Sequence, residues 1–248
     1  MNYEQKQVVV DGILTSYFDV GTGPTIVLLH GWLDSKETFA TLMDELSRKY
    51  RCIALDLPNF GSSQESDRII NLFDYSKFVR SFLYKLDVSR YCLLGHSMGG
   101  QISIFGTAEE ILMPSRLILL AAAGVRDEEK FKKSSIKYAS KLLKRIVPKP
   151  IKSRAYKLLK SDYDPSLSIV HKKIINAVLN TDIQKNALKL HVPTLLVYGS
   201  DDIHTTLSMG TKLNKHIKGS KLVILDGQDH WLHKKASDII AIRIAEFM

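Results

Sequence analysis

One decapeptide near the middle of the chain, Tyr91–Gly100, constrains the fold more than any other stretch. An apolar run at residues 91–94 leads into Gly-x-Ser-x-Gly at residues 95–99, and a helix-compatible segment begins at Gln101. This pattern predicts a strand, a sharp turn and a helix. The two glycines of the motif allow strand and helix to approach closely, and the turn lifts the hydroxyl of Ser97 clear of the sheet. The helix N-terminus then faces any negative charge that forms beside Ser97.

Strand and helix patterns alternate on both sides of this stretch. Continuous apolar runs, typical of strands covered on both faces of a parallel sheet, occur at residues 25–29, 51–56, 91–94, 116–122, 194–198 and 221–225. Helical spacing of apolar residues is found at residues 38–49, 72–86, 207–217 and 235–247. Near the N-terminus, Asp11-Gly12 separates two β-rich runs and predicts a hairpin. We therefore expect an α/β fold, a mostly parallel central sheet flanked by helices.

The alternation stops between residues 125 and 190. Segments 130–147, 151–159 and 164–180 have helical patterns, and a Pro-Lys-Pro sequence separates the first two. We interpret residues 125–190 as an inserted helical cap and residues 1–124 and 191–248 as the core. The net charge of +9 belongs to this insertion, because Arg126 to Lys189 holds 17 Lys and Arg against 6 Asp and Glu, and the rest holds 18 against 20. Since no aromatic motif accompanies the basic residues, we expect a solvated helical face and no nucleic-acid partner.

Composition excludes several other classes. An apolar content of 45% with 25% charged residues is ordinary for a soluble globular protein. The longest apolar run, residues 117–123, is too short to span a bilayer, and no basic leader with an apolar stretch opens the chain, so we expect a cytoplasmic protein without stable membrane insertion. Cys52 and Cys92 lie in expected buried strands, which favours core side chains over a disulfide or a metal pair. We expect no metal and no cofactor.

Five motifs together resemble the α/β-hydrolase family over nearly the whole chain. They are Gly-His-Ser-Met-Gly at 95–99, His-Gly-Trp at 30–32, Asp-Leu-Pro-Asn-Phe-Gly-Ser-Ser at 56–63, Gly-Ser-Asp-Asp at 199–202 and Asp-His-Trp at 229–231. Their order also matches the Ser, Asp, His order of that family. The resemblance implies that Ser97 is a nucleophile, His230 its base and Asp202 the acid that orients the base.

The resemblance also implies an oxyanion hole and a substrate pocket. The backbone N–H groups of Trp32 and Met98 would meet the oxyanion, and Trp32, Leu33 and Trp231 would contact the substrate. His30 and His96 flank the site and are expected to hydrogen-bond neighbouring loops, whereas His171, His191, His204 and His216 are most simply surface or loop residues.

Alternatives exist for two of these roles. His233 competes with His230 as the base, and Asp201, or less favourably Asp127, competes with Asp202 as the acid; the family pattern favours His230 and Asp202. Asp229 stands where the family usually has glycine, a departure that could perturb the loop of His230.

The function expected from these residues is hydrolysis of carboxylic esters of small to medium acyl chain through an acyl-enzyme on Ser97. A serine at this position disfavours dehalogenases and epoxide hydrolases, which carry aspartate there. The motifs look most like small carboxylesterases, including aryl esterases that share their site with perhydrolases. One alternative is a carbon–carbon bond hydrolase of ring-cleavage products, although residues 32–35 lack the Gly-rich, Pro-containing stretch usual in that group. A second alternative is a hydrolase-fold ligand receptor with vestigial turnover.

Overall fold

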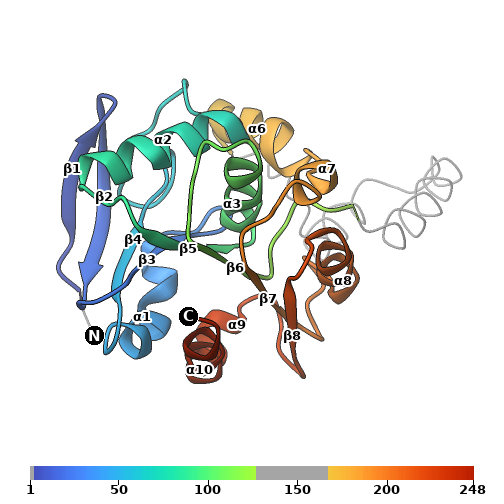
Figure 1. The fold of residues 1–248 in the computed structure, drawn as a ribbon. Helices are drawn as coiled ribbons and strands as arrows, with labels where there is room; N and C mark the ends of the chain where they lie inside the picture. Colours follow the sequence, from blue (N-terminus) through green and yellow to red (C-terminus); the bar gives the residue numbers. More distant parts are fainter. Residues whose placement is uncertain (1–2, 127–166) are drawn as a thin grey trace, which may run out of the picture.

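The computed structural model describes residues 3–126 and 167–248, which form one eight-stranded sheet between two layers of helices (Figure 1). The strands are β1 (Lys6–Val10), β2 (Ile13–Val20), β3 (Thr25–Leu29), β4 (Arg51–Leu55), β5 (Tyr91–His96), β6 (Arg116–Leu120), β7 (Thr194–Gly199) and β8 (Lys221–Leu225). They lie in the order β1-β2-β4-β3-β5-β6-β7-β8. From β4 onward in this order every neighbouring pair is parallel. The expected α/β fold with a mostly parallel sheet is confirmed.

The hairpin of β1 and β2 forms the antiparallel edge of the sheet. Asp11 and Gly12 connect the two strands with φ angles of 49° and 79°, the positive values that a type I′ turn requires. β2 then pairs antiparallel with β4. The hairpin therefore extends the sheet on one side, while β5 lies in its middle between β3 and β6.

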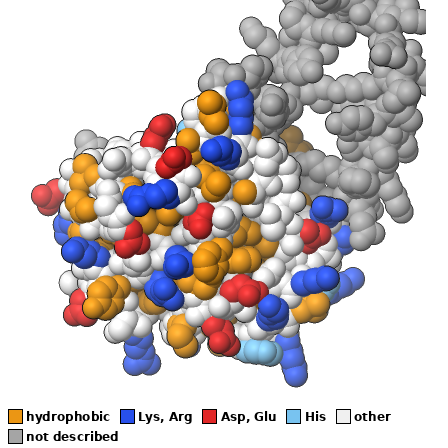
Figure 2. Space-filling model, turned by 90° about the horizontal axis from the view of Figure 1, so that it is seen from above, with side chains coloured by type: hydrophobic (Ala, Val, Ile, Leu, Met, Phe, Trp, Pro, Cys, Tyr) orange, Lys and Arg blue, Asp and Glu red, His pale blue; other side chains and the backbone are white. Residues whose placement is uncertain are grey.

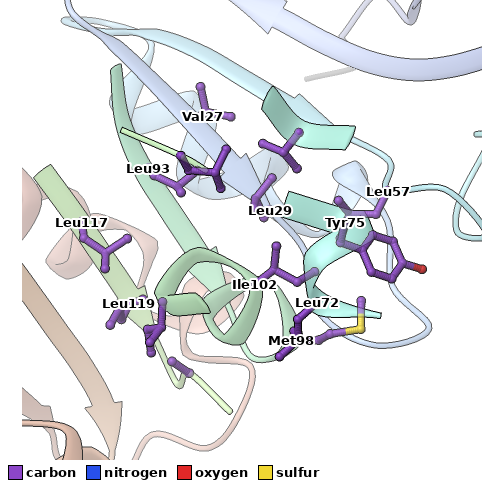
Figure 3. Close-up of a cluster of buried hydrophobic side chains, with 14 of the residues drawn as sticks. Val27, Leu29, Leu57, Leu72, Tyr75, Leu93, Met98, Ile102, Leu117 and Leu119 are labelled. Atoms are coloured by element: carbon purple, nitrogen blue, oxygen red, sulfur yellow. The ribbon is translucent and has the colours of Figure 1, made fainter. Parts of the chain in front are cut away.

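Each face of the sheet has its own apolar core, because successive side chains of a strand point to opposite faces. On one face Val27, Leu93 and Leu119 pack with α2 (Leu72–Lys85) and α3 (Met98–Ala108), as Figure 3 shows. The opposite face buries the alternate residues of the same strands with α1 (Ala40–Leu46) and α10 (Ser237–Phe247). Burial on both sides explains why these strands are continuous apolar runs in the sequence.

The helix boundaries differ from the sequence pattern at two places. The helix expected at 38–49 is a short 3-10 helix, η1 (Lys36–Phe39), followed by α1. The C-terminal helix expected at 235–247 is divided into α9 (Leu232–Lys235) and α10, with Ala236 between them in a non-helical conformation. Helices α2 and α8 (Leu207–His216) lie where the apolar spacing predicts them, and α3 begins at Met98, three residues before the helix-compatible segment expected from Gln101.

The predicted cap at 125–190 is described only in its last part. The helices expected at 130–147 and 151–159 lie outside the described residues. From residue 167 onward the chain forms α6 (Ile169–Ile174), the π-helix η2 (Ile175–Leu179) and α7 (Gln184–Ala187). The fully buried Gln101 of α3 connects this segment to the core. Its side-chain amide nitrogen, Nε2, donates to the carbonyls of Val178 and Thr181 at 2.8 Å each.

Charge on the described surface is mixed. Figure 2 views the molecule from above, the side of α2 and α6 in Figure 1, and shows Lys and Arg interspersed with Asp and Glu. This agrees with the near balance of 18 basic against 20 acidic residues outside Arg126 to Lys189. Among the described helices, none is long and apolar enough to cross a bilayer.

Candidate active site

Ser97 lies at the turn between β5 and α3, in a backbone conformation that non-glycine residues seldom adopt. Its φ and ψ are 51° and −114°. The surrounding backbone holds it there: Ser97 N–H donates to Leu120 O at 3.1 Å, and Ser97 O accepts from Gln101 N–H at 3.1 Å and Ala123 N–H at 3.0 Å. Strain of this kind persists only where neighbouring structure fixes it, and it is common at functional sites.

The glycines on either side of Ser97 are required by close contact. A methyl group on Gly95 would lie 2.5 Å from the carbonyl oxygen of Gly99, and one on Gly99 would overlap the carbonyl of Leu29. The helix therefore begins directly against the neighbouring strands β5 and β3. This contact aims the first turn of α3 at Ser97, as the sequence pattern predicts.

Asp202 and His230 come together from the loops after β7 and β8. His230 Nδ1 lies 2.8 Å from Asp202 Oδ2, and both residues are buried. The hydroxyl of Thr205 is 2.7 Å from the same carboxylate oxygen, while the backbone N–H groups of His204 and Thr205 donate to Oδ1 at 2.7 and 2.9 Å. Burial raises the pKa of Asp202, but the hydrogen bond and charge of His230 and these further donors outweigh it, so the pKa lies below its ordinary value.

Ser97 and His230 line one cavity of about 370 Å³. Apolar side chains form much of its wall, among them Trp32, Val125, Leu179, Met209 and Trp231. Two expected substrate contacts, Trp32 and Trp231, are thus at the cavity. The third, Leu33, is 55% exposed and is not among the described residues that line it.

Two backbone donors stand beside Ser97. Met98 is the first residue of α3, where N–H groups have no intrahelical acceptor. The loop that carries Trp32 also passes close to Ser97, because a methyl group on Gly31 would lie 3.2 Å from Ser97 Cβ. Within residues 3–126 and 167–248, neither the Trp32 nor the Met98 N–H donates a hydrogen bond. Both are available to a ligand.

Comparisons with known proteins agree with this arrangement. A sequence model described as the α/β hydrolase fold matches residues 24–117. The uncharacterized hydrolase YugF of Bacillus subtilis (strain 168) is 28% identical over 98% of this chain and 97% of its own. The chain has the α/β-hydrolase fold and resembles that family over nearly its whole length. This resemblance agrees with the family expected from the five motifs.

Two further relatives of this α/β hydrolase have named activities. The 2-hydroxy-6-oxo-2,4-heptadienoate hydrolase of Pseudomonas putida F1 is 25% identical over 92% of this chain and 90% of its own. Among solved structures, an esterase from Exiguobacterium antarcticum has the same fold, with a TM-score of 0.76 and 19% identity over 98% of this chain and 99% of that chain. Proteins similar to this chain therefore include a dienoate hydrolase and, by fold alone, an esterase.

Two buried histidines brace the loops of the hydrolase site. His30 Nε2 accepts from Leu57 N–H at 3.0 Å, so Nδ1 carries the proton and donates to Gly31 O at 2.8 Å. His96 Nε2 lies 3.0 Å from the carbonyl of His230, and because a carbonyl can only accept, Nε2 carries the proton there. Burial lowers the pKa of both imidazoles. The hydrogen bond from His96 therefore connects the loop that carries His230 to the end of β5.

The competing site residues lie elsewhere. His233 is fully buried, with Nε2 2.8 Å from Thr38 Oγ1, and it does not line the cavity. Asp201 is exposed and hydrogen-bonds Ser200 Oγ. Asp229 is half-buried and pairs with Lys235 at 2.6 Å. Asp127 is outside the described residues.

Three residues lie at the site although the sequence gives them no role there. Thr205 lies against the Asp202–His230 pair, and the His204 ring lies 5.2 Å from the ring of His230. His171 of α6 reaches the core, with its ring 5.6 Å from Trp32 and Nε2–H donating to Asn59 O at 3.0 Å. The expectation of a plain surface or loop residue is wrong for His171, which is half-buried in α6, whereas His204 is an exposed loop residue as expected. Of these three residues, only Thr205 could have been found from the sequence. It ends an Asp-x-x-Thr turn, in which the aspartate side chain accepts hydrogen bonds from the backbone N–H groups two and three residues later.

Proposed function

We propose that this α/β hydrolase cleaves carboxylic esters of small to medium acyl chain through an acyl-enzyme on Ser97. The observation that carries the proposal is the cavity shared by Ser97 and His230, whose Nδ1 is held 2.8 Å from Asp202. With the proton on Nδ1, His230 Nε2 has a free lone pair. A serine hydroxyl is a poor nucleophile until such a base accepts its proton.

These positions support the following catalytic sequence. His230 takes the proton of Ser97 as its oxygen attacks the ester carbonyl, and Asp202 stabilises the imidazolium that forms. The N–H groups of Met98 and Trp32 receive the oxyanion, each contributing about 3 kcal/mol to transition-state stabilisation. His230 then protonates the leaving alcohol. In the second half a water molecule repeats the attack on the acyl group and regenerates Ser97.

The cavity supports a preference for small to medium, largely apolar esters. Its volume of about 370 Å³ lies at the lower end of the range for ligand sites. Trp32, Leu179, Met209 and Trp231 offer apolar contact for the acyl chain, while Arg126 and Asp182 are charged residues of the same lining. Because Val125 and residues 179–182 line the cavity, we further propose that the inserted segment 125–190 acts as a cap that sets substrate size.

A p-nitrophenyl ester series from acetate to long acyl chains tests this function. Wild-type turnover should favour short and medium chains, and Ser97→Ala and His230→Ala should abolish it. Asp202→Asn should lower kcat by roughly 10³- to 10⁴-fold because the histidine loses its orienting acid. Asp201→Asn is the matched control, an exposed neighbour expected to keep near wild-type rates. No Ser97-dependent turnover on any ester would overturn the proposal.

A second candidate is hydrolysis of a carbon–carbon bond in ring-cleavage products. It is favoured by the 25% identity to the Pseudomonas putida 2-hydroxy-6-oxo-2,4-heptadienoate hydrolase over nine-tenths of both chains. The same assay format separates the two, because such dienoates lose their visible absorbance on cleavage. Ser97-dependent cleavage of a dienoate without ester turnover would replace the first proposal by the second. A stable acyl adduct without turnover would instead favour a receptor.

A further inference from the structure

A second group of polar side chains lies beside the proposed active site and has no part in its chemistry. Asp34, His96 and His233 each offer one ligand atom, and these atoms all lie within 4.8 Å of one another. The buried atoms without a partner on these residues are Asp34 Oδ2, His96 Nδ1 and His233 Nδ1. Both imidazoles are fully buried, and none of the three atoms has a hydrogen-bond partner. A buried polar atom without a partner is costly and uncommon in folded proteins. Three of them at one point indicate a shared ligand.

The outer contacts of these side chains leave a lone pair on His96 Nδ1 and are compatible with the same state of His233 Nδ1. His96 Nε2–H donates to the carbonyl of His230, so His96 Nδ1 is unprotonated. His233 Nε2 is paired with the hydroxyl of Thr38 at 2.8 Å, and Asp34 Oδ1 accepts from Ser35 N–H at 3.0 Å. Burial also keeps both imidazoles neutral, lowering the pKa of His233 to about 3. Metal-binding histidines characteristically make such a contact through their other ring nitrogen.

We propose that Asp34, His96 and His233 bind one divalent transition-metal ion, for which Zn²⁺ is the natural probe. Two imidazole nitrogens and one carboxylate oxygen are a donor set that Zn²⁺ accepts, with the fourth position open to water. A single water molecule has two protons and leaves one of three lone pairs unmatched, whereas a cation satisfies all three. Donors around tetrahedral Zn²⁺ are about 3.3 Å apart, so binding draws the side chains together. Asp34, which is only half-buried, can move to do so.

The proposed ion has a positioning role because of where its ligands come from. Asp34 follows Trp32 by two residues, His96 precedes Ser97, and His233 follows His230 by three residues. The ion would join the segments that carry the oxyanion donor, the nucleophile and the base. This site goes beyond ester hydrolysis, and its binding can be measured without any substrate.

The test uses the full chain without an affinity tag, stripped with a chelator and dialysed against equimolar Zn²⁺. Elemental analysis should find one Zn²⁺ per wild-type chain, and the melting temperature should rise with added ion. Co²⁺ in its place should give the visible absorption of a tetrahedral N/O site. Asp34→Asn and His233→Gln should each weaken retention by at least about tenfold. His216→Gln is the matched control, since its Nδ1 is also buried and unpartnered but lies outside the cluster.

Two results would overturn the site. Failure of wild-type protein to retain either ion stoichiometrically would show that the three atoms share water or a proton instead. Equal retention by wild type and the Asp34→Asn variant would place the ion elsewhere in the chain. Asp34→Asn decides the matter if His233→Gln does not fold, because Asp34 is half-buried and the change preserves its shape.

Discussion

Removing the hydroxyl of Thr205 tests how hydrogen bonds stabilise the buried carboxylate of Asp202. Asp202 receives four donors, of which Thr205 Oγ1–H, 2.7 Å from Oδ2, can be removed by a side-chain change that keeps the His230–Asp202 hydrogen bond. Thr205→Val keeps the size of this buried side chain and both backbone donors. The variant therefore removes one hydrogen bond to an ionised, buried carboxylate, together with the 3.1 Å contact of the hydroxyl with His230 Nδ1.

A hydrogen bond to a charged group contributes about 1.5–3 kcal/mol to stability, so Thr205→Val should lower the unfolding free energy by that amount at pH 7. With a urea m value of about 2 kcal/mol/M, the midpoint falls by about 1 M. Hydrogen bonding from Thr205 also helps to lower the pKa of Asp202, so the variant raises that pKa. Because a depressed carboxyl pKa gives stability that is lost as pH falls through the folded value, the variant should lose less between about pH 5 and pH 3 than wild type.

The assay is urea unfolding followed by tryptophan fluorescence at several pH values, beside Thr205→Ser. Serine keeps the hydroxyl and loses only a methyl group, so it should retain most of the stability that valine forfeits. Equal midpoints for wild type and Thr205→Val would refute the reasoning. Equal losses for the serine and valine variants would also refute it, because the effect would then come from packing rather than from the hydrogen bond.

Two further predictions concern the core and the edge of the sheet. Hydrogen bonds from Arg51 lower the pKa of Asp19. Asp19→Asn should therefore reduce the unfolding free energy by about 1 kcal/mol at pH 7, and by progressively less as pH falls below about 4. A reduction that stays constant in urea titrations across this pH range would contradict the ion pair. Burial raises the pKa of Cys52 and Cys92 to about 12, so neither thiol should react with a disulfide reagent at pH 8 until denaturant is added; rapid labelling of native protein would disprove their burial.

Local patterns predict the core of this fold closely. β3 and β8 have the limits that their apolar runs indicate, because Gly-Thr-Gly-Pro and Gly-Ser precede them and turn residues follow. Asp11-Gly12 predicts its hairpin for a similarly local reason, the need for positive φ at both turn positions. The pairing of Asp202 rather than Asp201 with His230 also agrees with the motif order.

Other features depend on contacts between distant segments and have no local pattern. Asp34, His96 and His233 meet only because β3 and β5 are neighbours and α9 folds back toward η1. Leu33 is exposed and has a φ of 50°, a conformation that its residue type does not indicate. The break at Ala236 between α9 and α10 has neither glycine nor proline to mark it.

Covalent labelling of Ser97 tests the central claim most directly. Intact-mass analysis after incubation with an alkyl fluorophosphonate should show one adduct per chain, located by peptide mapping on Ser97, because this reagent reacts with a serine that an adjacent base activates. His230→Ala should react far more slowly, and Ser97→Ala should not react at all. Absence of an adduct on wild-type protein, or an adduct on another residue, would contradict the nucleophile and the mechanism built on it.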